Sequence, residues 1–242
     1  MVLEYRLSQW LWGGMDWLFP PVCAGCKRTG FRWCPDCQQR VKLVQEPICQ
    51  ACGFPLSHPG MCPTCTASHP PYKAMRSWAI FEGPVRNAVH DLKYHRNVAL
   101  GDVLARHLVE YVRKLGWQPD MVVPVPLGRQ RMKERGYNQA GLLALPLSVN
   151  KGWHYSPQAV LRIKETRSQV GLSEWERVEN LSNAFRADPA RVSEKVILLI
   201  DDVATTGATI ASCSIALRKA GAKTVYALTL AKALPHHGLR IV

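Results

Sequence analysis

Residues 196–209 read VILLIDDVATTGAT, so a run of five apolar residues meets two acids and then a Thr-Thr-Gly turn. The apolar run predicts a buried strand over residues 196–200. Two neighbouring carboxylates repel each other, and the turn offers backbone amides with little side-chain bulk. We therefore expect this stretch to hold a ligand as well as to fold.

The residues that follow complete a strand–helix–strand unit. Their pattern predicts a helix over residues 208–220, ended by Gly221, and a second strand over residues 224–230. Two strands joined in this way lie parallel. We therefore predict an α/β domain in which helices flank a parallel sheet.

The turn stands where such sheets bind ligands. At the carboxyl end of the strand, the amides of residues 205–209 can point into one concavity at a helix N-terminus, which suits a phosphate group. Asp201 and Asp202 are expected to reach outward at an exposed strand end, where two adjacent acceptors match the vicinal hydroxyls of a ribose. The alternative is a chance loop in an unrelated α/β protein.

A polar linker with two prolines, TASHPPYKAM at residues 66–75, marks a domain boundary. We predict three parts of the chain on this basis. They are a Trp-rich segment at residues 1–20, a small Cys-rich domain at 21–68, and the α/β domain at 72–234.

The remaining predicted elements of the α/β domain are strands and helices in alternation. A basic loop is expected at residues 129–135, and Ser173 with Glu176 forms a capping box that opens a helix. The other elements are strands at 76–81 and 121–126, and helices at 85–92, at 103–115 and from about 138 onward.

Eight of the nine cysteines fall in four C-x-x-C pairs. Two intervening residues let both sulfurs turn toward one tetrahedral ion, and two such pairs fill a closed structural zinc site. We therefore predict two zinc ions. Pairing in sequence order assigns one site to Cys23, Cys26, Cys34 and Cys37, and the other to Cys49, Cys52, Cys62 and Cys65.

Other interpretations of the cysteines stay open at this stage. Crossed pairing would also give two sites, and His58 or His69 could replace a thiolate. A disulfide framework would suit a secreted protein, and four copies of the pair argue against redox chemistry. Cys213 stands alone in a predicted helix and is expected to be a buried apolar residue.

The chain is strongly basic, with 31 Lys and Arg against 18 Asp and Glu and a formal net charge of +13. Two zinc ions in four-thiolate sites would lower this charge to about +9. Such a balance favours a polyanionic partner, either nucleic acid or a phosphorylated substrate. The alternative is a basic surface that serves only solubility.

No segment of the sequence is predicted to span a membrane. Glu4, Arg6 and Asp16 interrupt the Trp-rich start well short of the ~20 apolar residues that a spanning helix needs. The start also lacks the basic and apolar regions of a signal peptide, so we expect a cytoplasmic protein. We expect the segment to dock on its own domain, with contact to a membrane surface or a partner as the alternative.

At residues 201–209 the sequence resembles the phosphoribosyl pyrophosphate signature of type I phosphoribosyltransferases, with Ala204 where a larger aliphatic residue is common. Three further blocks and the double zinc-binding front end resemble the ComF and GntX family. The blocks are LKYHRN at 92–97, VPVPLGRQRMKERGYNQA at 123–140 and LRIKETRSQVGLSEWERVENLSNAF at 161–185.

This resemblance implies a type I phosphoribosyltransferase-like domain that binds phosphoribosyl pyrophosphate with Mg²⁺. Asp201 and Asp202 would hold the ribose and stabilise positive charge, with Arg135 as a further catalytic residue. The other ligand-binding residues would be Lys93 and the loop Val203, Ala204, Thr205, Thr206, Gly207, Ala208 and Thr209.

The basic stretch near Arg129, Arg131 and Lys133 suits a pyrophosphate leaving group, with solvated surface residues as the alternative. A mobile flap would exclude water from the reacting centre. The resemblance places that flap and its anchors at Lys93, Arg162, Thr166, Gln169 and Arg177.

Two functions of different class fit these features. A phosphoribosyltransferase would release pyrophosphate in a Mg²⁺-dependent reaction with an unknown acceptor. A single-stranded DNA-binding accessory or regulatory module, linked to natural competence, DNA uptake and competence proteins, would instead keep a non-catalytic phosphoribosyl site. Such a module would bind strands of any sequence with salt-dependent affinity.

Overall fold

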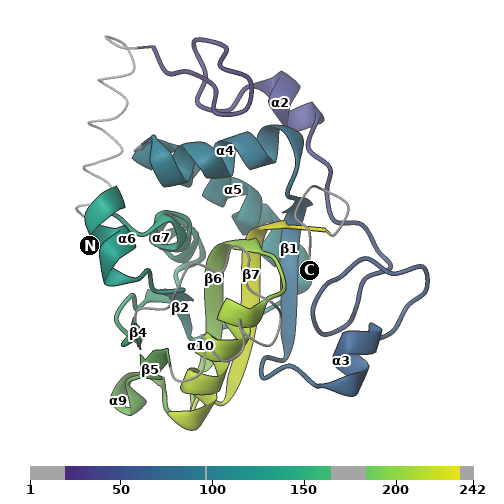
Figure 1. The fold of residues 1–242 in the computed structure, drawn as a ribbon, viewed down its shortest axis with the longest axis vertical. Coiled ribbons are helices and arrows are strands. Elements are labelled where there is room, and N and C mark those ends of the chain that lie inside the picture. Colours follow the sequence, from purple (N-terminus) through teal and green to yellow (C-terminus); the bar gives the residue numbers. More distant parts are fainter. Residues whose placement is uncertain (1–19, 96, 165–183, 235–242) are drawn as a thin grey trace.

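A computed structural model describes residues 20–95, 97–164 and 184–234 of the chain. Within these residues the main sheet has five strands, all parallel, in the order β1-β7-β6-β2-β3 (Figure 1). The predicted parallel sheet is confirmed. The strands are β1 Ala74–Ile80, β2 Met121–Pro124, β3 His154–Tyr155, β6 Val196–Ala204 and β7 Thr224–Lys232.

Helices cover both faces of this sheet (Figure 1). Three of them, α4 Gly83–Tyr94, α5 Val98–Leu115 and α7 Gln139–Lys151, pack on one face, and α10 Ala208–Lys219 packs on the other. A two-stranded antiparallel ribbon of β4 Val160–Arg162 and β5 Phe185–Ala187 lies beside α10. The short helices are α2 Pro35–Gln39, α3 Pro63–Ala67, α6 Arg129–Arg135 and α9 Pro189–Val192.

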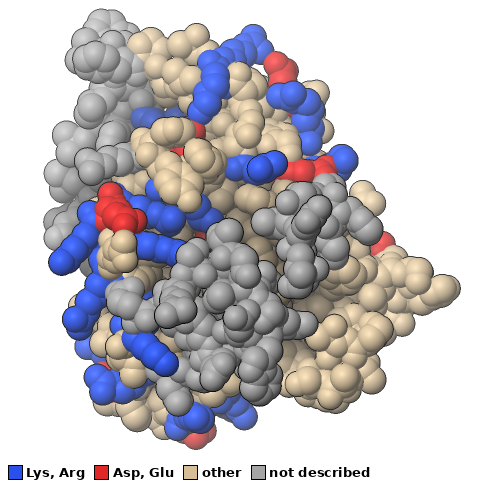
Figure 2. All heavy atoms as spheres, in the orientation of Figure 1, with Lys and Arg blue, Asp and Glu red and all other residues tan. Residues whose placement is uncertain are grey.

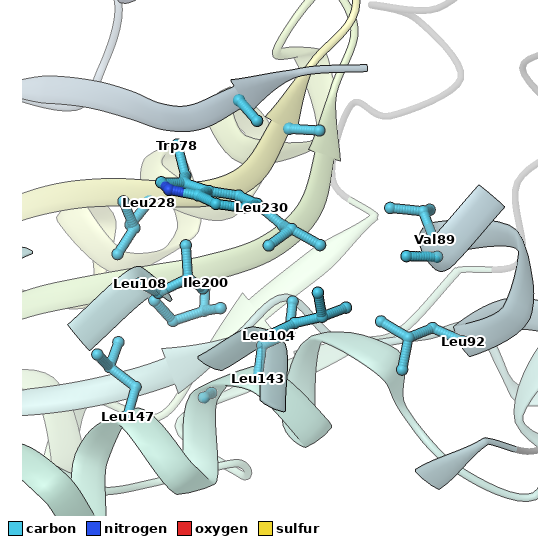
Figure 3. Packing of buried hydrophobic residues seen from close by; sticks show 14 of the residues in the cluster. Trp78, Val89, Leu92, Leu104, Leu108, Leu143, Leu147, Ile200, Leu228 and Leu230 are labelled. Atoms are coloured by element: carbon cyan, nitrogen blue, oxygen red, sulfur yellow. The ribbon is translucent and has the colours of Figure 1, made fainter. Parts of the chain in front are cut away.

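Each face of the sheet has its own hydrophobic core, because successive residues of a strand point to opposite sides. The first core lies under α4, α5 and α7 (Figure 3), and it contains Trp78, Val89, Leu92, Leu104, Leu108, Leu143, Leu147, Ile200, Leu228 and Leu230. The second core lies under α10, and it contains Met75, Val123, Ile197, Leu199, Ile210, Cys213, Leu217, Val225 and Ala227.

Close approach of α5 to α7 depends on a glycine. A Cβ atom placed on Gly101 would lie 2.6 Å from the Cβ of Leu142 and 2.8 Å from its carbonyl oxygen. Any larger residue would push the two helices apart and open the first core. The expected burial of Cys213 is also confirmed, since this residue is fully buried in the second core.

The helix expected at residues 103–115 begins earlier, at Val98, and two further differences bear on the site. The strand expected at residues 196–200 continues to Ala204, because residues 201–204 stay paired with β7 up to Lys232. The basic loop expected at residues 129–135 is the helix α6, which ends at Gly136 in a left-handed conformation. The predicted capping box of Ser173 and Glu176 lies outside the described residues.

The Cys-rich segment forms two knuckles, each a loop held by four cysteines, which we name the first knuckle (residues 23–37) and the second knuckle (residues 49–65). The chain between them runs antiparallel to β1. The amide of Val44 donates to the carbonyl of Trp78 at 3.2 Å, and the amide of Ile80 donates to the carbonyl of Lys42 at 2.8 Å. Among the helices of the described ranges, none combines the length and apolar character needed to cross a bilayer.

Candidate functional site

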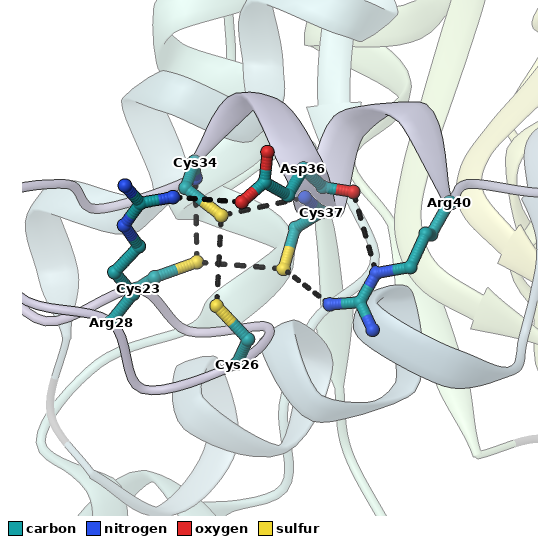
Figure 4. Close-up of polar contacts among 7 residues, drawn as sticks. All are labelled: Cys23, Cys26, Arg28, Cys34, Asp36, Cys37 and Arg40. Carbon is teal, nitrogen blue, oxygen red and sulfur yellow. Dashed lines mark hydrogen bonds and ion pairs between the residues drawn. The ribbon is translucent and has the colours of Figure 1, made fainter.

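The first knuckle brings four thiols together. The sulfur atoms of Cys23, Cys26, Cys34 and Cys37 all lie within 4.8 Å of one another (Figure 4). The amide of Cys34 donates to the sulfur of Cys23 at 3.3 Å, and a guanidinium nitrogen of Arg40 donates to the sulfur of Cys37 at 3.4 Å. Burial raises the pKa of Cys23, but the backbone amides led by that of Cys34 outweigh it and lower the pKa to about 7.

The second knuckle repeats this arrangement with Cys49, Cys52, Cys62 and Cys65. The amide of Cys62 donates to the sulfur of Cys49 at 3.3 Å. Burial raises the pKa of Cys49, yet backbone amide donors again dominate and lower it to about 6. The sequential grouping is confirmed and the crossed grouping is wrong, while His58 and His69 belong to neither group.

The first knuckle docks on α4. Lys27 Nζ lies 2.6 Å from Oδ1 of the buried Asp91, and the side-chain amide of Asn87 donates to the carbonyl of Gly25 at 2.8 Å. Ala24 is fully buried in the first core. The first knuckle is thus attached to the helix whose last turn carries Lys93.

The second knuckle docks on β1 through backbone atoms. The amide of Met75 donates to the carbonyl of Ala51 at 2.7 Å, and the guanidinium of Arg76 donates to the carbonyl of Gln50 at 3.1 Å. Gly53 has a φ of +64°, and a Cβ there would lie 2.6 Å from the carbonyl oxygen of Met75. Only glycine allows this approach.

Asp202 lies within β6, on the face of the sheet covered by α4 and α7, and is only 4% exposed. Its Oδ2 is 2.7 Å from Nζ of Lys93, and the same oxygen accepts no well-oriented hydrogen bond from the described residues. Burial raises the pKa of Asp202, but the Lys93 ammonium outweighs burial and holds the pKa below its usual value. The expectation of an exposed strand end is therefore wrong for this residue, because β6 continues beyond it.

Asp201 points to the opposite face of β6, toward α10, because the strand alternates. This carboxyl is partly buried, and Oδ1 accepts a hydrogen bond from the amide of Asp202 at 2.9 Å. Burial, and then the negative charge of Asp202, raise the pKa of Asp201 well above its usual value. The charge of Asp201 acts in turn on the buried thiol of Cys213, whose pKa is raised first by its own burial.

The loop after β6 turns at Gly207, which has a φ of +82° and opens α10. A Cβ on Gly207 would lie 3.3 Å from Cε of Met75 and 3.7 Å from Oη of Tyr72. Thr205 is exposed and Thr206 half-buried, so the turn faces solvent over part of its length. The other residues of the predicted loop are the half-buried Val203, Ala208 and Thr209 and the buried Ala204.

A chain of polar contacts links α6 to Asp202. Nη1 of Arg135 donates to Oε1 of Gln139 at 2.9 Å, and the buried Gln139 in turn hydrogen-bonds Asp202 and lowers its pKa. The structure therefore brings Arg135, Lys93 and Asp202 together, as their assignment to one site requires. Lys93 lies in the last turn of α4.

The other residues assigned to pyrophosphate or to the flap lie at different places. Arg129, Arg131 and Lys133 are exposed on α6, and Arg162 lies on β4. Thr166, Gln169 and Arg177 fall outside the described residues. Sequence reasoning missed Gln139, although this residue stands inside the motif block at 123–140.

The chain is similar to several known proteins. A family model described as a double zinc ribbon domain matches residues 14–66. The DNA utilization protein YhgH of Salmonella typhimurium is 35% identical over 219 residues, which are 88% of this chain and 91% of that protein. Competence protein F of Haemophilus influenzae is 34% identical over 211 residues, 83% of this chain and 90% of that protein. This chain belongs to the competence protein F (ComF) family.

ComF-family membership confirms the resemblance drawn from the motifs. Among solved structures, adenine phosphoribosyltransferase from Thermoanaerobacter pseudethanolicus is 15% identical with a TM-score of 0.34, covering 51% of this chain and 77% of its own. A glutamine phosphoribosylpyrophosphate amidotransferase from Bacillus subtilis is 19% identical with a TM-score of 0.36, covering 58% and 26%. The assignment to the ComF family depends on the curated relatives and not on these scores.

Proposed function

We propose that this chain binds phosphoribosyl pyrophosphate, or a related ribose phosphate, with Mg²⁺ at the carboxyl end of β6, in the service of DNA use in the cytoplasm. The observation that supports this most is the buried Asp202, paired with Lys93 and keeping an oxygen without a well-oriented hydrogen bond. A ribose hydroxyl is a donor that such an oxygen can accept. The Thr205–Gly207 turn beside it offers amides to the phosphate.

The oxygen atoms available at this site suit a magnesium ion that arrives together with its ligand. Magnesium binds hard oxygen ligands, and it commonly uses one or two carboxylates, substrate phosphates and several waters. Asp202 supplies one charged carboxylate, and outside the two cysteine groups the described ranges hold no cluster of three or more metal-ligating side chains. The ion would therefore arrive with its ligand and neutralise charge on the pyrophosphate.

The side chains around this site have distinct roles in binding. Lys93 neutralises Asp202, so that the carboxylate can remain buried until a sugar arrives. Gln139 keeps Arg135 in place, and Arg135 presents a fixed positive charge toward the ligand's phosphates. If a transfer reaction takes place, these groups contribute orientation and electrostatic stabilisation of the reacting sugar.

Isothermal titration calorimetry with phosphoribosyl pyrophosphate and Mg²⁺ tests this proposal. We expect the double variant Asp201→Asn with Asp202→Asn to lose binding, since neither amide carries the charge that the sugar and ion require. Asparagine is chosen because alanine would leave a hole beside Lys93. Asp120→Asn, at the other end of β6, is the matched control and should bind like the parent chain. Equal affinity in the double variant would refute the assignment.

Each knuckle is proposed to hold one structural zinc ion. Four thiols within 4.8 Å of one another match the requirements of a closed tetrahedral site. The amide donors to Cys23 and Cys49 stabilise the thiolates that such an ion needs. These ions would fold the knuckles and would take no part in chemistry.

A second function, binding of single-stranded DNA, is supported by the surface of α6. Four of its seven residues are basic, one is acidic, and none is fully buried. Figure 2 shows Lys and Arg side chains gathered on this side of the molecule. Competence proteins are proposed partners, in keeping with the names of the relatives.

Fluorescence anisotropy with a labelled single strand tests the second function. The logarithm of the affinity should fall by about 0.7 for each phosphate contacted per log unit of salt. Charge reversal at Arg129, Arg131 and Lys133 should weaken binding and reduce that slope. If excess phosphoribosyl pyrophosphate displaces all bound DNA, the basic residues serve only the small ligand and the DNA proposal fails.

A further inference from the structure

Tyr94, the last residue of α4, is 60% exposed and is more exposed than any other large apolar side chain of the described residues. Exposure of a large aromatic ring costs hydrophobic free energy that burial would recover. Lys93, its neighbour in the chain, contacts Asp202, so Tyr94 is exposed one residue away from the candidate ribose-phosphate site. The position of this ring calls for a ligand that uses an exposed aromatic face.

The ring of Tyr94 is held in place by neighbours on other elements. The guanidinium carbon of Arg135 lies 5.3 Å from the ring centroid, and the ring of His90 lies 4.6 Å away at an interplanar angle of 48°. Arg135 is itself fixed by its hydrogen bond to Gln139. Tyr137 donates a hydrogen bond of 2.7 Å to the carbonyl of Leu92, which ties the end of α4 to the residues after α6.

These contacts order the ring before any ligand binds. A side chain that is already fixed loses little conformational freedom on binding, so each contact it makes contributes more to affinity. Arg135 and His90 occupy only part of the ring's surroundings, because most of the side chain stays accessible to solvent. Tyr94 therefore presents a rigid, open aromatic surface.

The charges around Tyr94 are those that a nucleic-acid backbone requires. Arg86, His90 and Tyr94 are spaced by four residues along α4, and all three are exposed, so they share one side of the helix. Basic residues of α6 flank the same ring through Arg135. An aromatic ring between basic side chains is the arrangement by which proteins bind single strands, with bases stacked on rings and phosphates on cations.

We propose that Tyr94 is a stacking platform for one base of a bound DNA single strand, whose backbone follows the basic residues of α6 and α4. This inference rests on the proposed DNA-binding function and adds to it the residue that contacts a base. A single strand is specified because duplex bases stack on each other and cannot offer a free face to a side chain.

The test compares an oligothymidine of about 20 nucleotides with an abasic strand of the same length and charge, by fluorescence anisotropy. Tyr94→Ala should bind oligothymidine about ten-fold more weakly than the parent chain, while Tyr94→Phe should retain the affinity. The salt slope should be unchanged in both variants, because the slope counts phosphates and not bases. The parent chain should bind the abasic strand as weakly as Tyr94→Ala binds oligothymidine.

Phe31→Ala is the matched control, since Phe31 is also an exposed ring under an arginine but belongs to the first knuckle. Its oligothymidine affinity should stay within about two-fold of the parent. Thermal unfolding of Tyr94→Ala should match the parent, as expected for an exposed side chain. Parent-like affinity of Tyr94→Ala would overturn the stacking proposal alone, whereas failure of the parent chain to bind any single strand at low salt would overturn the DNA-binding function and this inference with it.

Discussion

On the face of the sheet covered by α4 and α7, Asp202 pairs with Lys93 at 2.7 Å and has a lowered pKa. On the α10 face, Asp201 experiences burial and the like charge of its neighbour, and its pKa is raised. The two carboxyls are adjacent in sequence, yet the strand turns them toward different surroundings. One carboxyl is therefore held as a charged acceptor, while the other is biased toward its neutral form, which can donate.

The same two faces also differ in which knuckle they carry. In the first knuckle, Ala24 packs in the first core, and Lys27 forms an ion pair with Asp91 of α4. The second knuckle packs Cys52 against the second core and bonds to the backbone of β1. Each aspartate thus shares its face of the sheet with one knuckle, and the following predictions test whether the two faces are independent.

The largest effect is expected from loss of zinc. The parent chain should contain two zinc ions, because binding of a structural zinc contributes about 10 to 16 kcal/mol in peptides. The pair Cys23→Ser with Cys26→Ser and the pair Cys49→Ser with Cys52→Ser should each lose one ion. Elemental analysis gives the count, and hydrogen exchange should show faster exchange in α4 for the first pair and in β1 for the second. Loss of both ions in either variant would break the comparison, because the faces would then unfold together.

The next effect concerns the attachment of the second knuckle. Gly53→Ala would place a Cβ 2.6 Å from the carbonyl oxygen of Met75 at a φ of +64°. Backbone strain and overpacking together should cost about 3 kcal/mol, which lowers the melting temperature by about 10 °C. Gly116→Ala is the control, since Gly116 has the same φ and nothing within 4 Å, so it carries the backbone strain alone. Equal melting temperatures of the two variants would show that the knuckle does not press on β1.

Removal of Lys93 should destabilise the face of the sheet on which Asp202 and Lys93 form an ion pair. Lys93→Met leaves the carboxylate of Asp202 buried without a compensating charge and should cost about 2 kcal/mol at neutral pH. The folded-state pKa of Asp202 lies below its unfolded value of ~3.9, so the pair stabilises the protein above that pH and its contribution is lost as pH falls through the folded pKa. The deficit of Lys93→Met should therefore shrink in acid, as urea unfolding at several pH values would show. Lys93→Arg should retain most of the stability, and a pH-independent deficit would contradict the pairing.

The smallest change is expected on the α10 face of the sheet, where removing the charge of Asp201 should raise stability and not lower it. Asp201→Asn should be more stable than the parent chain at neutral pH. The folded-state pKa of Asp201 is raised, so folding keeps a proton that the unfolded chain releases above ~3.9, and stability falls as pH rises from there. The gain should vanish near pH 4, where the unfolded chain is also protonated. A loss of stability in Asp201→Asn at neutral pH would mean that both aspartates are held as charged groups, and the contrast between the faces would be gone.

Local pattern predicted much of this fold. The apolar run at residues 196–200 and the spacing of the cysteines are properties of a few neighbouring residues, so they could be recognised in the sequence. The extension of β6 to Ala204 could not, because its pairing with Lys232 joins residues that are far apart in the chain. The burial of Asp202 follows from that same extension.

The polar network around the site was also beyond local reasoning. Lys93 of α4 and Gln139 of α7 meet at Asp202 only after both helices have packed on one face of the sheet. The helix α6 has no buried residue, so its sequence lacks the apolar periodicity from which a helix is predicted. Motif resemblance pointed to these stretches of chain, but a motif carries no information about which element holds each residue, so the place of Lys93 in the last turn of α4 came from the structure.

The short run of chain between the knuckles has a consequence for the behaviour of the protein in solution. Residues 42–44 take up hydrogen-bonding groups on the outer side of β1, which would otherwise form an open edge of the sheet. Open edges pair with strands of other molecules and lead to aggregation. Residues 42–44 lie between the two cysteine groups, so zinc depletion would release this segment and expose the edge of β1. If the knuckles hold zinc as proposed, its removal should therefore make the chain aggregate through β1, independently of any ligand it binds.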